Sequence, residues 1–146
     1  MSRHVVPPLA VIRINRIHVE APVLEGTDDI SLNRGVGHIA NTAFFGENGN
    51  VGIAGHRDGF FRGLKDVKVG DRIDLEETDG TETYIVGRLE VVSPDNVSAL
   101  RSSSKPALTL VTCYPFYYIG KAPQRFVVHA SLAASDSQTR ANTIPN

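Results

Sequence analysis

The chain has 146 residues, of which 41% are hydrophobic and 21% charged, and its formal net charge is −1 at pH 7. This length and composition fit one domain with one ordinary core, and the near-neutral charge without lysine or arginine blocks argues against binding to nucleic acid or anionic membranes. One cysteine forms no internal disulfide and, without a CxxC pair, no common thiolate zinc site. No apolar run approaches the roughly 18 residues of a membrane span, and the first residues carry no signal-peptide core.

The first third of the chain predicts short strands and one short helix. Apolar and polar residues alternate from residue 9 to residue 23, with a break near Asn15, which indicates two strands. Residues 28–35 are typical of a short helix, because acidic residues begin it and Gly35 closes it.

A loop-rich region follows, with a possible short strand between residues 35 and 50. Residues 51–56 form an apolar run with small residues, so we expect a buried strand that ends at His56. Asp58 is placed to cap a brief helix whose Phe and Leu side chains face the core.

The second half of the chain predicts further strands. An Asp-Gly pair at residues 79 and 80 indicates a hairpin between strands at 72–76 and 81–92. Residues 93–106 are polar and predict a surface loop with at most one helical turn. Two more strands are expected, at 107–113 and 125–132.

Many short strands with no long helix favour an all-β barrel or sandwich over a βαβ architecture. We expect the domain to span residues 9–134, between a flexible N-terminal segment at 1–8 and a disordered polar tail at 135–146.

Three residues at strand ends carry candidate chemistry: Cys113, His56 and Arg125. A thiolate attacks a carbonyl carbon, an imidazole passes a proton to a leaving amine, and a guanidinium donates several hydrogen bonds to a substrate backbone or oxyanion. The three are far apart in the sequence, so only the fold can bring them together.

Each of these residues also has a purely structural interpretation. A lone cysteine in a strand is often a small buried hydrophobic residue, and a lone histidine is often packed in the core. His38 is a rival for the role of base, and Asp58 is a better helix cap than catalytic carboxylate. Most arginines lie on the surface without a role in chemistry, and Arg125 alone is not distinguished from them.

Three motifs resemble those of the sortase family, cysteine transpeptidases of the bacterial envelope, and the likeness is closest to class D and related classes. TLVTC at residues 109–113 resembles the nucleophile motif, AGHRD at 54–58 the histidine motif, and APQRFVV at 122–128 the arginine strand. The motifs occur in family order, and the resemblance runs from about residue 9 to residue 132. Supporting segments are residues 14–26, 35–39 and the start of the hairpin at 69–71.

The resemblance implies a closed eight-stranded β-barrel with short helices in loops, with Cys113 at the end of the seventh strand and Arg125 on the eighth. It implies cleavage of an LPxTG-like sorting signal after threonine through a thioacyl-enzyme, and transfer to an amine acceptor such as a peptidoglycan precursor or a pilin lysine. His56 would protonate the leaving amine and help deprotonate the incoming one. The residues implied to bind substrate are Thr112, Tyr114, Ile53 and Ala54, with the loop at residues 93–106.

The resemblance further implies sorting-signal-bearing proteins as partners, and a place on the extracytoplasmic face of the cell membrane. A membrane anchor is expected in the native protein, although this chain contains no candidate for one. No cofactor and no metal are expected. The acids at residues 76, 77 and 79 lie beside a hairpin turn and lack an EF-hand pattern.

Two other functions remain open at this point. The same residues would serve a thiol endopeptidase that uses water as acceptor, and a catalytically inactive barrel would only bind envelope peptides. An L,D-transpeptidase fits less well, because a His-Gly-Cys signature is absent around Cys113.

Overall fold

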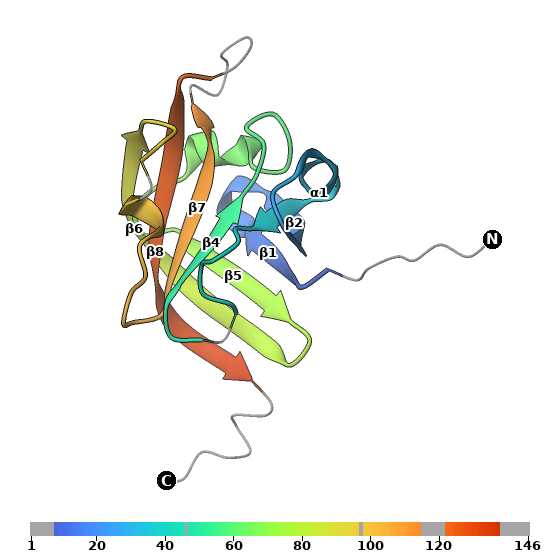
Figure 1. Cartoon of the computed structure of the whole chain (residues 1–146). Helices are drawn as coiled ribbons and strands as arrows, with labels where there is room; N and C mark the ends of the chain where they lie inside the picture. Colours follow the sequence, from blue (N-terminus) through green and yellow to red (C-terminus); the bar gives the residue numbers. More distant parts are fainter. Residues whose placement is uncertain (1–7, 46, 97, 115–121, 138–146) are drawn as a thin grey trace, which may run out of the picture.

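The structure is a computed structural model that describes residues 8–45, 47–96, 98–114 and 122–137. Its strands form a closed barrel in the order β1-β2-β3-β4-β7-β8-β6-β5. Figure 1 shows the arrangement of the strands and of α1. The strands are β1 (Ala10–Ile14), β2 (Val19–Glu25), β3 (Val36–His38), β4 (Asn50–Ala54), β5 (Arg72–Glu77), β6 (Gly80–Val92), β7 (Ala107–Tyr114) and β8 (Gln124–Ser137). The predicted all-β, closed eight-stranded barrel is confirmed.

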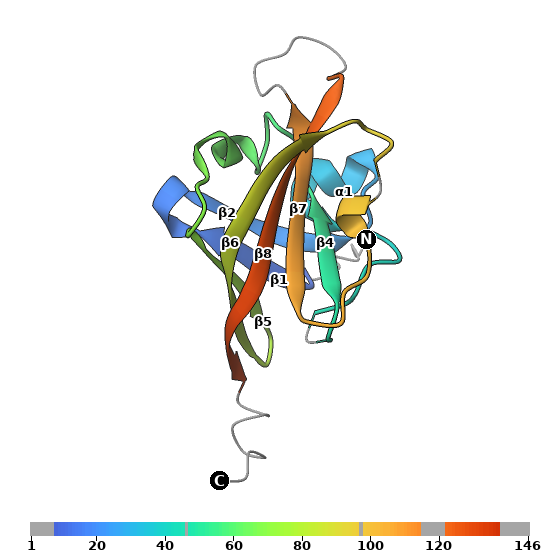
Figure 2. The same ribbon diagram turned by 90° about the vertical axis from the view of Figure 1, so that its left-hand side faces the viewer.

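Strand β7, which ends at Cys113 and Tyr114, lies between β4 and β8. It pairs in parallel with β4 on one side and antiparallel with β8 on the other. Strand β8 in turn pairs antiparallel with β6, so β4, β7, β8 and β6 lie side by side (Figure 2). Among the described residues, each strand has a neighbour on both sides in the closed barrel, so none is an edge strand.

The core is filled by the inward-facing residue of each strand. In β1, Ile12 and Ile14 are fully buried, while Arg13 between them points outward and pairs with Glu76 of β5. In β7, Leu108 and Leu110 are fully buried in the core, and Thr109 between them is buried as well. The period-two burial in β1 is the pattern that the sequence shows there.

The short helices lie in the connections between strands: η1 (Asn15–Ile17), α1 (Asp29–Arg34), η2 (Arg62–Asp66) and η3 (Ser98–Leu100). Helix α1 begins as predicted, since the Asp28 carboxylate accepts a hydrogen bond of 2.8 Å from the Ser31 backbone N–H. The cap predicted at Asp58 is wrong: η2 begins only at Arg62, and its N-cap position is Phe61, which makes no side-chain capping bond.

The final strand is longer than predicted. Strand β8 runs to Ser137 rather than residue 132, because its last residues pair with the first residues of β6. The β-structure therefore continues three residues past the predicted domain boundary at 134. Residues 1–7 and 138–146 lie outside the described residues, so flexibility at both ends of the chain stays a prediction.

Candidate functional site

Cys113 and Arg125 are directly opposite each other in the ladder between β7 and β8. On the other side of β7, Ala54 of β4 lies opposite Val111, and the Gly55 N–H donates a hydrogen bond of 3.1 Å to the Val111 carbonyl just past the end of β4. His56 follows Ala54 by two residues, as Cys113 follows Val111. Strand β4 ends at Ala54, so His56 lies two residues beyond it, in the segment beside the end of β7 that the Gly55 hydrogen bond holds.

The three candidate residues are all half-buried, so their functional groups remain accessible from solvent. The Cys113 thiol is free. The Arg125 guanidinium is oriented by two hydrogen bonds from Nη1, to the carbonyls of Gln124 at 2.9 Å and Ala122 at 3.3 Å. In the described part of the chain neither its Nε nor its Nη2 has a partner, which leaves donors for an incoming group.

The four residues expected to bind substrate lie on two different faces. Ala54 is half-buried and shares the outer face with Val111 and Cys113. Ile53 is fully buried in the core, so its side chain lies on the face opposite Ala54, and its contact with substrate stays a prediction. Residues that alternate with Cys113 along the strand point to the barrel interior rather than to the thiol face.

Thr112 and Tyr114 follow this alternation. The Thr112 side chain is buried, and its hydroxyl lacks a hydrogen-bond partner among the described residues. The Tyr114 ring stacks on Phe126, with ring centroids 6.1 Å apart and planes at 24°. Phe126 itself packs against the core cluster. Both residues support the strand beneath Cys113, and direct substrate contact through their side chains stays a prediction.

His38, the rival base, has a structural role. It is buried on β3, its Nδ1 lies 3.0 Å from a Glu25 carboxylate oxygen, and its Nε2 lies 2.9 Å from the Ala43 carbonyl. The rings of Phe44 and Phe45 pack edge-on against it. With both ring nitrogens engaged, His38 fixes the segment after β3 rather than serving a reaction at Cys113.

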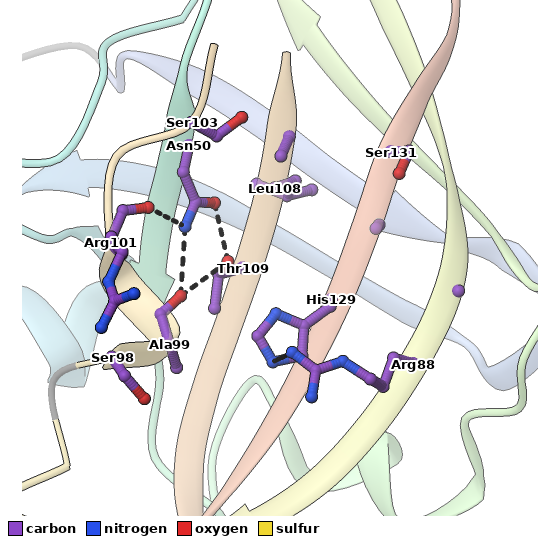
Figure 3. A pocket seen from close by; sticks show the side chains of 13 residues that line it. Asn50, Arg88, Ser98, Ala99, Arg101, Ser103, Leu108, Thr109, His129 and Ser131 are labelled. Carbon is purple, nitrogen blue, oxygen red and sulfur yellow. Dashed lines mark hydrogen bonds between the residues drawn. The ribbon is translucent and has the colours of Figure 1, made fainter. Parts of the chain in front are cut away.

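A cleft of about 380 Å³ lies on the face of β7 that carries Cys113, beside the loop at residues 93–106 (Figure 3). Thr109 is part of its lining and precedes Cys113 by four residues, or about 13 Å of strand. One side of the cleft is formed by residues 98–101, which we call the wall segment. The β7 residues that line the cleft, at 107–109, all precede Cys113 in the strand, so the cleft lies along β7 on the N-terminal side of Cys113.

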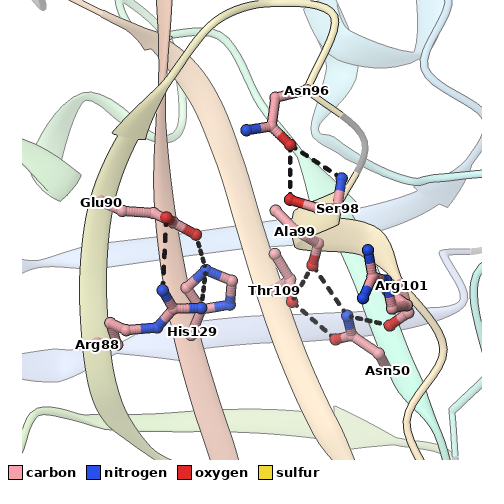
Figure 4. A network of polar contacts seen from close by, with 9 residues as sticks. All are labelled: Asn50, Arg88, Glu90, Asn96, Ser98, Ala99, Arg101, Thr109 and His129. Carbon is pink, nitrogen blue, oxygen red and sulfur yellow. Dashed lines mark hydrogen bonds and ion pairs between the residues drawn. The ribbon is translucent and has the colours of Figure 1, made fainter.

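The wall segment is tied to the sheet by polar contacts that sequence reasoning missed. Asn50 of β4 donates to the carbonyls of Ala99 and Arg101, and Thr109 of β7 donates to the Asn50 side-chain oxygen (Figure 4). Asn50 stands in a stretch interpreted as loop, and no local signal links it to residues about fifty positions away.

The opposite side of the cleft carries a charged cluster. Glu90 of β6 lies 3.4 Å from the Arg88 guanidinium and 2.5 Å from Nε2 of His129 on β8 (Figure 4). The mutual pairing of these side chains holds them on the outer face of β6 and β8.

The described residues hold no group of three or more His, Cys, Asp or Glu side chains that is arranged to bind a metal ion. None of the helices in the described ranges has the length and apolar character that crossing a membrane requires.

The architecture is that of a known family. It is a closed eight-stranded barrel with a cysteine and an arginine opposite each other on adjacent strands, and a histidine that follows a third strand. Residues 12–133 match the family model for the sortase domain. The chain belongs to the sortase family, whose members are cysteine transpeptidases associated with the cell surface.

The relatives include class D members. Sortase D of Bacillus subtilis (strain 168) is 37% identical over 120 residues, which cover 82% of this chain and 61% of the relative. A Clostridium perfringens Sortase D5 transpeptidase structure superposes with a TM-score of 0.78 at 33% identity, covering 87% of this chain and 79% of that one. The catalytic domain of B. anthracis SrtD gives a TM-score of 0.77 at 32% identity, with 94% and 98% covered. The chain spans about three fifths of the B. subtilis protein's length.

Proposed function

We propose that this protein cleaves an LPxTG-like sorting signal after its threonine and transfers the acyl part to an amine acceptor. The observation that carries the proposal is the direct opposition of Cys113 and Arg125 across β7 and β8, with the His56 segment on the other side of β7. A thiol and a cation thus share one accessible face, and the segment that bears the proposed base lies on the other side of the thiol strand; these are the groups that acyl transfer requires.

In the first half-reaction, the Cys113 sulfur attacks the threonine carbonyl carbon as a thiolate. The carbonyl oxygen takes up negative charge, and the free N–H groups of Arg125 donate hydrogen bonds to it or to the adjacent substrate backbone. When the C–N bond breaks, His56 gives a proton to the leaving amine, and a thioester to Cys113 remains.

In the second half-reaction, an amine attacks the thioester carbonyl carbon. His56 accepts the proton that the amine loses, the C–S bond breaks, and the sulfur leaves as the thiolate from which the cycle began. The products are a new amide and the free enzyme. The acceptor is an amine of a peptidoglycan precursor or a pilin lysine.

The partners we propose are proteins that bear the sorting signal, as sortases generally recognise. The site of action is the extracytoplasmic face of the cell membrane, with an anchor in the native protein. Both statements rest on membership of the family.

The test is incubation of the protein with a quenched sorting-signal peptide at rising concentrations of an amine, with both products followed by mass spectrometry. The proposal predicts that the amide product displaces the free acid as the amine concentration rises, and that Cys113→Ala removes both. Free acid alone at all amine concentrations would favour a thiol endopeptidase. Full activity of Cys113→Ala would contradict the proposal.

A further inference from the structure

We infer that Asn50 and Thr109 are positioning residues that hold the wall segment in place for substrate, and that they set the affinity for the sorting signal rather than the rate of chemistry. The inference rests on the proposed function. It concerns a contact between the sheet and the loop that follows β6, at a distance from the reacting atoms.

Both polar atoms of the Asn50 side-chain amide take part in this contact. Its Nδ2 donates to the carbonyls of Ala99 and Arg101, each at 3.1 Å, and its oxygen accepts from the Thr109 hydroxyl at 2.7 Å. The Thr109 hydroxyl also lies 3.4 Å from the Ala99 carbonyl. One side chain therefore replaces the hydrogen bonds that the wall segment would otherwise make with water.

The contact is buried, so water cannot readily replace a hydrogen bond that is lost there. Asn50, Ala99 and Thr109 are 7%, 8% and 1% exposed. Removal of a partner from such a site leaves a carbonyl without a donor and without water, and the unpaired group favours any movement that exposes it again. The favoured movement here is detachment of the wall segment from the sheet.

A second contact holds the same segment. Gly52 lies opposite Thr109 in the ladder, and a Cβ at Gly52 would lie 3.0 Å from a methyl carbon of Leu100 and 2.9 Å from a methyl carbon of Thr42. The absence of a side chain at Gly52 thus allows the loop to approach the sheet closely. Apolar contact and hydrogen bonds act on the wall segment together.

The two strands in this contact are the strands that position the reacting groups. Asn50 is on β4, which leads to His56, and Thr109 is on β7, which carries Cys113. The wall segment is therefore fixed relative to both groups, on the face where Cys113 lies. An extended peptide held at Cys113 would reach the level of Thr109 after about four residues, so the wall segment meets the bound peptide rather than the scissile bond.

The kinetic test compares Asn50→Ala with Asn48→Ala, a matched control in which the amide is exposed and two residues away. We expect Asn50→Ala to raise KM for the sorting-signal peptide at least tenfold while kcat and the rate of Cys113 alkylation by iodoacetamide stay within twofold of wild type. Asn48→Ala should match wild type in all three. An unchanged KM in Asn50→Ala, or a loss of kcat and alkylation rate with KM unchanged, would overturn the inference.

Variants of Thr109 cover the case in which Asn50→Ala does not fold. Thr109→Val keeps the shape but removes the hydroxyl, so KM should rise severalfold, whereas Thr109→Ser should restore it to within twofold of wild type. A KM that is equal in both variants would contradict a hydrogen-bonding role.

Limited trypsin digestion provides a readout that does not depend on activity. The Arg101 carbonyl belongs to the peptide bond that trypsin cleaves and accepts a hydrogen bond from Asn50. Cleavage after Arg101 should be at least tenfold faster in Asn50→Ala than in wild type or Asn48→Ala, and equal rates would count against the inference. If the wild-type protein cleaves no sorting-signal peptide, the proposed function is contradicted. The digestion rates alone then show whether Asn50 holds the wall segment.

Discussion

Cys113 and Arg125 are cross-strand neighbours, one on β7 and the other on β8. Side chains in such pairs have Cβ atoms about 4.5–5.5 Å apart and share a face of the sheet. The backbone ladder, rather than a flexible loop, therefore fixes the thiol relative to the guanidinium. This geometry makes Arg125 sensitive to substitutions that preserve charge but change shape.

We predict that Arg125→Lys lowers kcat/KM for the sorting-signal peptide by more than tenfold, which corresponds to about 1.4 kcal/mol of transition-state stabilisation. A lysine ammonium lacks the planar set of donors that can bond the Gln124 carbonyl and the substrate together. Steady-state kinetics measure the effect, and Arg34→Lys at the exposed end of α1 is the control. Activity within twofold of wild type would rule out a transition-state role for Arg125.

The two histidines should separate activity from stability. His56→Ala is expected to abolish turnover with little change in the free energy of unfolding, because His56 is only half-buried. His38→Ala should retain turnover but lose about 1–3 kcal/mol of stability, since it leaves Glu25 and the Ala43 carbonyl without their partner. Peptide cleavage and urea unfolding of both variants measure this, and the opposite pattern would make His38 the base.

Asp71 should make stability depend on acid. Two hydrogen bonds from Arg16, at 2.6 and 2.7 Å, hold the pKa of the buried Asp71 carboxyl below its ordinary value. Because the folded-state pKa is depressed, the stabilisation is complete above the unfolded pKa of about 4 and is lost as the pH falls through the folded value.

Asp71→Asn is therefore expected to cost about 1.5–3 kcal/mol at pH 7, and the difference from wild type should shrink as the pH falls below about 4. Urea unfolding between pH 7 and pH 2 measures it. Asp79→Asn is the control, because Asn-Gly suits the same exposed hairpin turn as Asp-Gly. A difference that stays constant over this range would show that the Arg16 contact has no electrostatic part.

Substitutions at Ile53 and Ala54, which are neighbours on β4, should affect different properties: stability at Ile53 and KM at Ala54. Ile53→Ala creates a core cavity and should cost about 2–5 kcal/mol with KM nearly unchanged, because Ile53 is fully buried. Ala54→Leu adds bulk on the face shared with Val111 and should raise KM with little loss of stability. Unfolding and kinetic measurements on both variants test the assignment of faces, and a large KM effect in Ile53→Ala alone would contradict it.

The sequence allowed the strands and the three candidate residues to be predicted, because a cysteine at the end of an apolar run and a histidine after another are local patterns. The grouping of Ile53 with Ala54 as substrate-binding residues overlooked a local rule: in a strand only residues two apart share a face, so the Ile53 side chain lies opposite the face of Ala54. The contact of Asn50 with Thr109 spans 59 residues. It became visible only once β4 and β7 were seen to pair, because a long-range hydrogen bond leaves no periodic trace in the sequence.

Intact-protein mass spectrometry can show whether Cys113 carries the acyl group between donor and acceptor. With a sorting-signal peptide and no amine, we expect an added mass on Cys113 equal to the peptide fragment that ends at its threonine, less one water. Addition of an amine should discharge this adduct into an amide. Cleavage of the peptide by Cys113→Ser at the wild-type rate, with no adduct on the wild-type protein, would show that Cys113 does not carry the acyl group.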